Sequence, residues 1–570
     1  MGSTGISLRT TQRAPRSCLS CASRKVKCDK SVPCSRCIKR GQADACVREM
    51  VIIRGEVTTW QDGPHVLTYE ELSRENQRLR REISVLRAER GELPQSNARP
   101  VTLGSIKESQ YSSGAEEQLW QNISTTPETR ASSTILHWED IILPSPACSD
   151  RLIAYDRTWH SWVHYALEYP HFSHECTVFM GTMQENLSLD KADASWMAVY
   201  FSVLSTALLM MDDAEAENLP LPDGEQLWLQ IRINHQETSA NWYHAAIFCL
   251  HKADFMRIPS IRSVQAIAIL GISFNNRGDS ELGEHLWSSA IRIAQRIGLD
   301  QGYSEMASSC LSAEGQHRLW WTFVICDWLT LPYRPPRVHD TDFDVPLPSA
   351  TSTDEEEKVT HPVHYHIFMA RTSTIFYYFR QAIRSGPASL AEMAQVVRKA
   401  DEELAEIIDT LPVHLRPDAD ESDEIRRLEL AQPWIKWQRF DLTLVLLHLR
   451  LQINCTLQEQ WLSYPGQYDW ARTISVRSAM SIVWINRNWD QPISMRKQWA
   501  LSYHIFASAL ALLSECRSDS STEDEEYTET IQGAVELLEK IKEHSAVAYH
   551  AARILRENMV KGNQTDGSLD

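Results

Sequence analysis

The sequence lacks the features of a secreted or membrane-spanning protein. No apolar stretch before Arg9 is similar to the core of a signal peptide, so we expect no secretory leader. The most apolar segment, residues 196–211, contains several hydroxyl side chains and precedes Asp212 and Asp213. It is shorter than the roughly 20 apolar residues that a membrane span needs. We therefore interpret it as a buried core helix and expect no membrane partner.

Strand patterns and fixed-period repeats are also scarce. From about residue 152 onwards the apolar residues hardly ever alternate with polar ones, and long amphipathic segments dominate. Residues 280–297 place Leu282, Leu286 and Ile293 on one stripe and stop at Gly298, a typical residue after a helix end. This pattern predicts an all-α domain large enough for one or two cores. Irregularly stacked helix pairs remain an alternative.

Six of the thirteen cysteines are concentrated near the N-terminus, whereas the other seven are scattered without pairing spacing. Two C-x2-C pairs each place two thiolates on one short turn, and one later cysteine closes each half. Two tetrahedral zinc ions need eight bonds, which six sulfurs supply when two of them bridge. A three-disulfide knot is the alternative, but it suits small secreted domains. The predicted zinc ligands are Cys18, Cys21, Cys28, Cys34, Cys37 and Cys46.

Basic residues are interleaved with these cysteines. Residues 9–48 contain eleven Lys or Arg against Asp29 and Asp44, a local net charge of +9 in a chain of −18. Six thiolates and two zinc ions would leave a charge of −2, which part of the basic excess neutralises. We expect the remaining positive charge to face phosphate groups.

The spacing C-x2-C-x6-C-x5-C-x2-C-x8-C, with RKVKCD around Cys28, resembles the fungal Zn2Cys6 binuclear zinc-cluster transcription factors. The resemblance implies that Cys18 and Cys34 bridge the two metals. It also implies that a short helix after the second cysteine enters the major groove, where Arg24 and Lys25 read a CGG-like triplet. Such cations match the guanine O6 and N7 acceptors. Further candidates for DNA contacts are Lys27, Arg16 and Lys30.

One triplet carries too little information for a genomic site, so we expect two clusters to act together. Residues 68–93 provide a heptad pattern with leucines at d and a single asparagine at a, which favours a two-stranded coiled coil. Glu at g and Arg at e are self-complementary, which favours a homodimer. A lone surface helix with i to i+4 ion pairs is the alternative. The predicted dimerisation residues are Leu72, Asn76, Leu79, Ile83 and Leu86.

Three further segments, residues 288–300, 317–329 and 334–348, look like the fungal-specific transcription factor domain. That resemblance implies an all-helical regulatory module and no enzyme. Within it, Asp340, Asp342 and Asp344 form a D-x-D-x-D pattern, but Val345 stands where a calcium loop needs glycine, so we interpret this segment as a loop after a helix. His364 with His366, and Asp212 with Asp213 and Glu217, lack the partners that a zinc or magnesium site requires.

The expected domain order runs from a disordered N-terminus to a disordered tail. Its segments are 1–13, disordered; 14–48, zinc cluster; 49–67, linker; 68–93, coiled coil; 94–150, low-order tether with one short helix near 113–122; 151–515, all-helical regulatory domain; 516–530, acidic loop; 531–560, C-terminal helix; and 561–570, disordered tail. An activation segment is the alternative interpretation of the acidic loop.

The sequence thus predicts a nuclear, zinc-dependent regulator of RNA polymerase II transcription that holds two zinc ions per chain and binds double-stranded DNA as a homodimer. The family resemblance implies an activator of a metabolic or biosynthetic gene set, with coactivators or the transcription machinery as partners. Nineteen tryptophans motivate one more hypothesis, a small-molecule effector in an aromatic pocket. The alternative function is a regulator that acts mainly through protein partners, with a weak or heterodimeric DNA-binding module.

Overall fold

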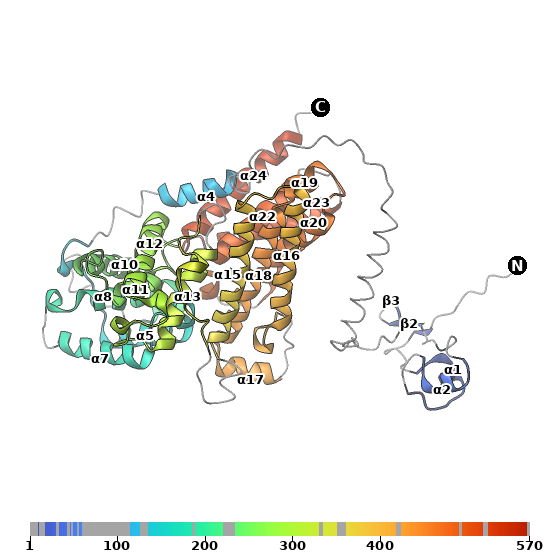
Figure 1. Cartoon of the computed structure of the whole chain (residues 1–570), viewed down its shortest axis with the longest axis horizontal. Coiled ribbons are helices and arrows are strands. Elements are labelled where there is room, and N and C mark those ends of the chain that lie inside the picture. Colours follow the sequence, from blue (N-terminus) through green and yellow to red (C-terminus); the bar gives the residue numbers. More distant parts are fainter. Residues whose placement is uncertain are drawn as a thin grey trace. The chain divides into compact units, whose positions relative to one another are not determined.

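A computed structural model describes two units, Met1–Thr102 and Leu103–Asp570 (Figure 1). The described residues are 9–10, 17–29, 33–42, 46, 50–53, 56–59, 114–125, 135–184, 188–220, 234–329, 335–349, 361–417, 423–489, 493–516 and 522–566. The predicted coiled coil at 68–93 lies outside these residues, as do Arg16 and Lys30.

The described residues of the first unit form two short helices and a small sheet. The helices are α1 (Leu19–Ser23) and α2 (Ser35–Lys39), and the strands are β1 (Arg9–Thr10), β2 (Met50–Ile53) and β3 (Glu56–Thr59). β2 pairs antiparallel with β3, with Met50 opposite Thr59 and Ile53 opposite Glu56, and parallel with β1. The expected disorder of 1–13 and the expected linker of 49–67 are therefore wrong for these residues. β-Branched residues dominate β2 and β3 and favour extended pairing.

The second unit confirms the all-α prediction, because every regular element described in it is helical. Its α-helices are α4 (Gly114–Thr125), α5 (Pro146–Trp159), α6 (Ser161–His164), α7 (Tyr169–Gln184), α8 (Ala194–Met210), α9 (Asp213–Glu217), α10 (His235–Lys252), α11 (Ile261–Leu270), α12 (Ser280–Arg296), α13 (Ala313–Leu329), α15 (Val363–Arg384), α16 (Leu390–Thr410), α17 (Asp423–Ala431), α18 (Trp434–Cys455), α19 (Gln458–Ser463), α20 (Asp469–Asn488), α21 (Ile493–Arg496), α22 (Trp499–Cys516), α23 (Thr522–Glu539) and α24 (Ala546–Asp566). Short 3-10 turns are η2 (Trp138–Asp140), η3 (Leu189–Lys191), η5 (Leu299–Gln301), η6 (Glu305–Ala307), η7 (Asp340–Asp342) and η8 (Val413–Leu415).

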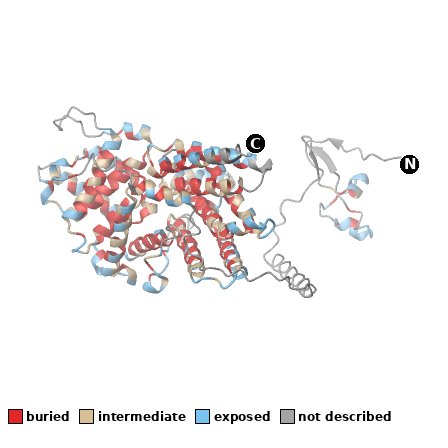
Figure 2. Cartoon of the chain, turned by 90° about the horizontal axis from the view of Figure 1, so that it is seen from above, coloured by how far each residue is buried: buried red, intermediate tan, exposed pale blue. Residues whose placement is uncertain are grey.

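Among its described residues, the second unit has two hydrophobic cores. The first is built around α8, which packs against α5, α10 and α11, and it continues through α13, α15 and α16. The second is formed by α20, α22, α23 and α24 with one face of α18. Figure 2 shows that buried residues gather along the helices inside the second unit. Residues 196–208 of α8 are all buried, which confirms the predicted core helix. None of the helices in the described part of the chain has the length and apolar character of a membrane span.

A buried lysine joins the two cores. Lys497 is 1% exposed and donates to the carbonyls of Leu209 and Met211 and to the carboxylate of Asp213, 2.9 Å away. Asn276 donates to the backbone carbonyl of Lys497. Three acceptors therefore compensate the buried ammonium group for its lost hydration. Asp213 is a structural partner of this lysine.

Helix α4 confirms the short helix expected within the tether, but it is packed onto the second core. Leu119 and Ile123 are fully buried, and the Trp120 ring lies 6.0 Å from Trp499 and 5.6 Å from Tyr503. Residues 135–150 also belong to the domain, because Ile135, Ile141 and Cys148 enter the first core. The tether predicted for 94–150 is therefore wrong over 114–125 and 135–150. The apolar residues there are buried in contacts far away in the sequence.

The C-terminal region also differs from the prediction. The acidic run expected as a loop at 516–530 lies largely in α23, which begins at Thr522. Acidic side chains in a first helical turn interact favourably with the helix dipole, so this composition suits a helix start. The single helix expected over 531–560 is two helices, α23 and α24, and α24 continues to Asp566 within the expected tail.

The segment 335–349 is held against α13 by an ion pair between a partly buried arginine and a buried aspartate. Arg337 Nη1 lies 2.9 Å from Asp327 Oδ1, and Trp328 Nε1 donates to the Val338 carbonyl. Asp340 accepts hydrogen bonds from the hydroxyls of Tyr377 and Tyr378. This geometry confirms the interpretation of the D-x-D-x-D pattern as a structural loop.

Candidate metal centre and nucleic-acid interface

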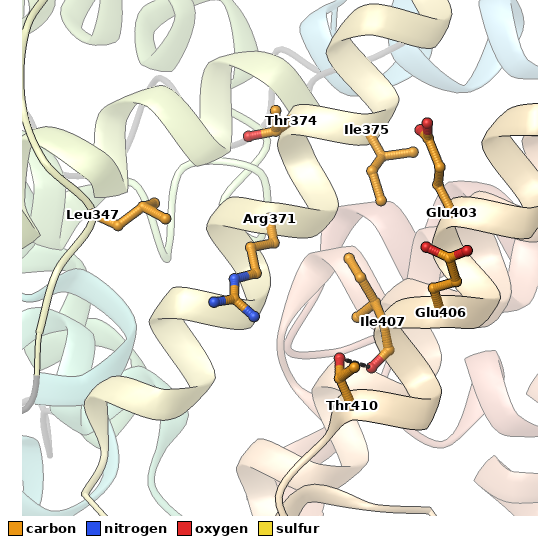
Figure 3. A pocket seen from close by; sticks show the side chains of 8 residues that line it. All are labelled: Leu347, Arg371, Thr374, Ile375, Glu403, Glu406, Ile407 and Thr410. Atoms are coloured by element: carbon orange, nitrogen blue, oxygen red, sulfur yellow. Dashed lines mark hydrogen bonds between the residues drawn. The ribbon is translucent and has the colours of Figure 1, made fainter. Parts of the chain in front are cut away.

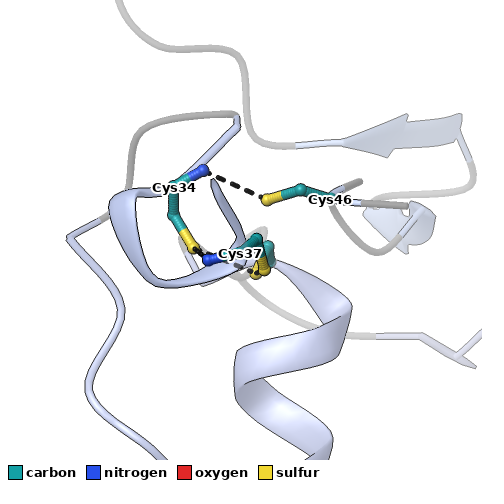
Figure 4. A group of neighbouring side chains, drawn as sticks. Cys34, Cys37 and Cys46 are labelled. Carbon is teal, nitrogen blue, oxygen red and sulfur yellow. Dashed lines mark hydrogen bonds between the residues drawn. The ribbon is translucent and has the colours of Figure 1, made fainter. Parts of the chain in front are cut away.

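Each C-x2-C pair of the first unit begins a helix. Cys18 is the N-cap of α1 and Cys34 is the N-cap of α2, with nearly the same backbone angles (φ −66°, ψ 153° and φ −75°, ψ 151°). The second cysteine of each pair, Cys21 or Cys37, therefore lies on the first turn of its helix, near the first. The Cys37 N–H donates to Cys34 Sγ, as Figure 4 shows. Helix starts thus place the paired sulfurs close together.

Both helices end in the same left-handed turn. After α1, Val26 N donates to the Cys21 carbonyl and Lys25 has a φ of 55°; after α2, Gln42 N donates to the Cys37 carbonyl and Gly41 has a φ of 66°. These bonds follow the Schellman pattern of helix termination. The two half-sites are thus structural repeats of each other. Only Gly41 gave a sequence signal for this turn, and the conformation of Lys25 was not predicted.

All six predicted ligands are buried cysteines that form no disulfide and lie together. They form two groups of four, Cys18–Cys21–Cys28–Cys34 and Cys18–Cys34–Cys37–Cys46, in which the sulfurs lie within 4.8 Å of one another. The sulfur of Cys18 is 3.9 Å from that of Cys34. The sulfurs of Cys18 and Cys37 are 3.8 Å apart, and those of Cys21 and Cys34 are 3.6 Å apart. Sulfurs bound about 2.3 Å from one tetrahedral zinc ion lie about 3.8 Å apart, so the donor set fits zinc.

Three of the clustered thiols, Cys18, Cys21 and Cys37, need a nearby positive charge to ionise at neutral pH. The Cys37 N–H hydrogen bond lowers the pKa of Cys34 to about 6, and the bond to Cys34 raises the pKa of Cys37 to about 12. Burial raises the pKa of Cys18 and Cys21. Cys18, Cys21 and Cys37 are therefore neutral thiols at neutral pH without a metal. Metal binding supplies the positive charge that converts them to thiolates.

The predicted DNA-reading residues lie just after α1. Arg24 is its C-cap, and Arg24, Lys25 and Lys27 are all exposed. Arg24 Nη2 donates to Gln42 Oε1 at 3.2 Å, so the turn of the second half-site orients this guanidinium group. The second half-site also exposes Arg36, Lys39 and Arg40, which were not among the predicted site residues. Arg40 repeats the position of Arg24.

The other candidate metal groups have structural roles. Within the part of the chain that the structure describes, the two cysteine groups are the only sets of three or more His, Cys, Asp or Glu with metal-binding geometry. The His366 ring is buried and stacks on Tyr165 with centroids 4.2 Å apart, and burial lowers the pKa of His366 to about 3. Asp212 accepts a hydrogen bond from Ala214 N at the start of α9.

Two protein-family models match the chain. Residues 16–50 match the fungal Zn(2)-Cys(6) binuclear cluster domain, and residues 154–399 match the fungal specific transcription factor domain. The chain belongs to the fungal Zn2Cys6 transcription factors. The first match covers all six cysteines and the basic residues Arg24, Lys25 and Lys27.

Several curated proteins are similar to this Zn2Cys6 factor. It is 21% identical to a transcriptional regulator of Aspergillus novofumigatus, over 55% of this chain and 48% of that relative. It is 22% identical to the agnestins biosynthesis cluster transcription factor of Paecilomyces divaricatus, over 97% of this chain and 86% of that relative. It is 23% identical to the aurofusarin cluster transcription factor of Gibberella zeae, over 55% of this chain and 44% of that relative. The matches thus span about half the length of the first and third of these relatives.

The Zn2Cys6 factor also resembles a solved structure. The core of the CBF3 complex of K. lactis matches with a TM-score of 0.51 and 13% identity, over 79% of this chain and 90% of that chain. At this identity the similarity concerns the fold alone.

Proposed function

We propose that this chain is a zinc-dependent, sequence-specific DNA-binding regulator of RNA polymerase II transcription. The observation that carries the proposal is the pair of four-sulfur groups sharing Cys18 and Cys34, with exposed Arg24 and Lys25 on the turn beside them. Both matched family models describe parts of transcription factors, and the three relatives are named as regulators. This agreement supports a nuclear regulator and not an enzyme.

The six cysteines hold two zinc ions in this proposal, with Cys18 and Cys34 as the bridging ligands. Cys21 and Cys28 complete one tetrahedron, and Cys37 and Cys46 complete the other. The zinc ions are structural: they cross-link α1, α2 and the loops around them. In the described part of the first unit, the buried cluster consists of these six cysteines, with Val26 packed against it. DNA binding is therefore expected to depend on the metal.

Base recognition is assigned to the turn after α1. A left-handed turn at Lys25 directs the chain away from the helix end, and both Arg24 and Lys25 are exposed there. Each can donate to guanine O6 and N7 in a CGG-like triplet. Lys27 and the repeated basic residues of the second half-site, Lys39 and Arg40, supply charge for phosphate contacts.

Two chains are proposed to bind two triplets through the heptads at 68–93. The support is the leucine repeat and the complementary Glu and Arg flanks in the sequence. Two relatives are named as transcription factors of biosynthetic gene clusters, which supports a biosynthetic gene set as the target. Within that proposal the second unit has a regulatory role.

The test is a selection of bound sequences from random duplex DNA by the full zinc-loaded chain at near-physiological salt. We expect two CGG-like triplets at one fixed spacing. The double change Arg24→Ala and Lys25→Ala should abolish the enrichment. The double change Leu79→Ala and Leu86→Ala should leave single triplets. Recovery of random sequence by the unchanged chain would contradict the proposal.

A matched control separates base reading from charge. Arg40→Ala removes one positive charge at the position that repeats Arg24. We expect this variant to select the same triplets with a weaker overall affinity and a salt slope lower by about one. Loss of sequence preference in Arg40→Ala to the same extent as in Arg24→Ala would show that the turn after α1 is not the base-reading element.

A further inference from the structure

A groove of about 410 Å³ lies between α15 and α16, far along the chain from the cysteines (Figure 3). Its volume is within the range of small-molecule sites, about 300–1,000 Å³. The segment 335–349 contributes Leu347 to its rim. The family match ends at residue 399, so the α16 wall, residues 403–410, lies outside the matched region. The lining residues are Leu347, Arg371, Thr374, Ile375, Glu403, Glu406, Ile407 and Thr410.

One wall of the groove presents a cation. Arg371 on α15 is exposed, and its guanidinium carbon lies 5.3 Å from the centre of the Phe368 ring one turn earlier. That ring contact positions the side chain along the helix. Among the described residues, no carboxylate forms an ion pair with Arg371 and no acceptor takes a hydrogen bond from it. Its N–H donors are therefore available to an anionic group in the groove.

The opposite wall presents two anions. Glu403 and Glu406 project from neighbouring positions of α16, across the groove from Arg371 (Figure 3). Glu403 is 3.7 Å from the ammonium group of Lys399, whereas Glu406 has no ion pair with any of the residues that the structure describes. Glu406 is thus an acceptor for an ammonium or hydroxyl group of a ligand.

The space between the charges is apolar. Ile375 from α15 and Ile407 from α16 line it, and Leu347, 41% exposed, covers one side. The hydroxyls of Thr374 and Thr410 donate to carbonyls of their own helices. They contribute methyl groups and acceptor lone pairs but no free hydroxyl hydrogen. A ligand therefore meets a cation, an aliphatic surface and an anion in turn.

We propose that the groove between α15 and α16 binds a small amphipathic carboxylic acid that carries an ammonium or hydroxyl group at its far end. The carboxylate pairs with Arg371, the aliphatic body lies on Ile375 and Ile407, and the distal donor bonds to Glu406. Because α15 and α16 also belong to the first core, the bound molecule stabilises that part of the second unit. The proposal does not depend on DNA binding or on the coiled coil.

The test measures binding of a dipolar probe to the full zinc-loaded chain without DNA. The probe is aminooctanoate, and octanoate and octylamine each lack one of its charges. Isothermal titration calorimetry and thermal shift at millimolar probe are the readouts. We expect aminooctanoate to bind about tenfold more tightly than either single-charge probe, since each of these probes lacks one charge-assisted hydrogen bond.

Variants assign the binding to the groove. Arg371→Met keeps the aliphatic stem and should weaken aminooctanoate and octanoate about tenfold. Glu406→Gln should weaken aminooctanoate but leave octanoate unchanged. Arg257→Met is the matched control, because Arg257 is 85% exposed and lies outside the groove. Absence of aminooctanoate binding, or equal binding by the Arg371→Met chain, would overturn the proposal.

Discussion

Cys18 and Cys34 differ from the other four clustered cysteines because each belongs to both four-sulfur groups. A change at a shared sulfur affects both metal positions, whereas a change at Cys28 or Cys46 affects one. Only the positions of the sulfurs distinguish these two cysteines, because all six thiols are buried to a similar extent. Metal content is therefore a direct measurement of which sulfurs are shared.

We expect Cys18→Ser or Cys34→Ser to lose both zinc ions, and Cys46→Ser to retain about one zinc ion per chain. Native mass spectrometry of the full chain measures the metal content. Tryptophan fluorescence is the folding control, because every tryptophan except Trp60 lies in the second unit. Equal zinc content in the Cys18 and Cys46 variants would show that Cys18 does not bridge.

Lys25 has a backbone conformation that glycine adopts more readily. Its φ of 55° matches the 66° of Gly41 at the equivalent turn. A non-glycine residue in this region has a conformational cost of about 1–2 kcal/mol. A lysine at such a position is consistent with a functional requirement for its charge, because local strain is often found at binding sites.

A comparison of two variants separates the strain from the charge. Lys25→Ala and Lys25→Gly both remove the ammonium group, and we expect both to lower DNA affinity about tenfold, the discrimination of one good base contact. Only Lys25→Gly removes the strain, so it should hold zinc more tightly than Lys25→Ala by about 1 kcal/mol in chelator competition. Equal zinc retention would mean that this turn is not strained.

At the scale of elements, α4 shows how a short helix in a polar region becomes part of a domain. Gly114–Thr125 is flanked by residues rich in Ser and Thr, yet its apolar face is buried against α24 and α22. Tyr503 Oη also donates to Glu116 Oε1 at 3.1 Å. The helix is therefore stabilised by tertiary packing, as short helices generally are.

Replacement of the α4 anchor tests this packing. Trp120 is 8% exposed, so Trp120→Ala should destabilise the second unit by about 3–5 kcal/mol. Trp484→Ala is the matched control: Trp484 is 59% exposed and should change stability by no more than about 0.5 kcal/mol. Urea unfolding followed by circular dichroism measures both. If the Trp120→Ala chain were as stable as the control, α4 would not be a packed part of the second unit.

At the scale of the whole second unit, burial shifts the pKa of several histidines downward and of two aspartates upward. Burial lowers the pKa of His366 and His504 to about 3 and that of His414 to about 4. Burial raises the pKa of Asp327 and Asp441 to about 6. Between about pH 4 and 6.5 the unfolded chain binds protons at these histidines that the folded chain does not, which lowers stability. Below about pH 6 the folded chain binds protons at the two aspartates that the unfolded chain does not, which raises stability.

The three histidines outweigh the two aspartates, so the unfolded second unit binds more protons in that window. Its stability is therefore expected to fall as the pH is lowered from about 6.5 to 4. His366→Phe should reduce the slope by about 1.4 kcal/mol per pH unit, whereas the exposed His285→Gln should not change it. Urea midpoints by tryptophan fluorescence measure the slope. An unchanged slope in His366→Phe would contradict the assignment.

Short-range spacing by itself determined the chemistry of the first unit. The intervals among Cys18, Cys21, Cys28, Cys34, Cys37 and Cys46 already predicted two overlapping metal positions, because helix starts bring residues three apart together. Hydrophobic periodicity likewise predicted the all-α class and the buried helix at 196–211. Both patterns depend only on residues that are near one another in the chain, so they can be recognised from a single sequence.

Only the tertiary structure decided what depends on residues far apart in the sequence. The docking of α4 on α22, the ion pair of Arg337 with Asp327 and the junction at Lys497 follow from how the helices pack. The groove also depends on such packing, because Arg371 and Glu406 line the same groove only after α15 and α16 pair. Periodicity predicts that a face is buried, but the partner of that face is selected by shape and charge across the folded domain.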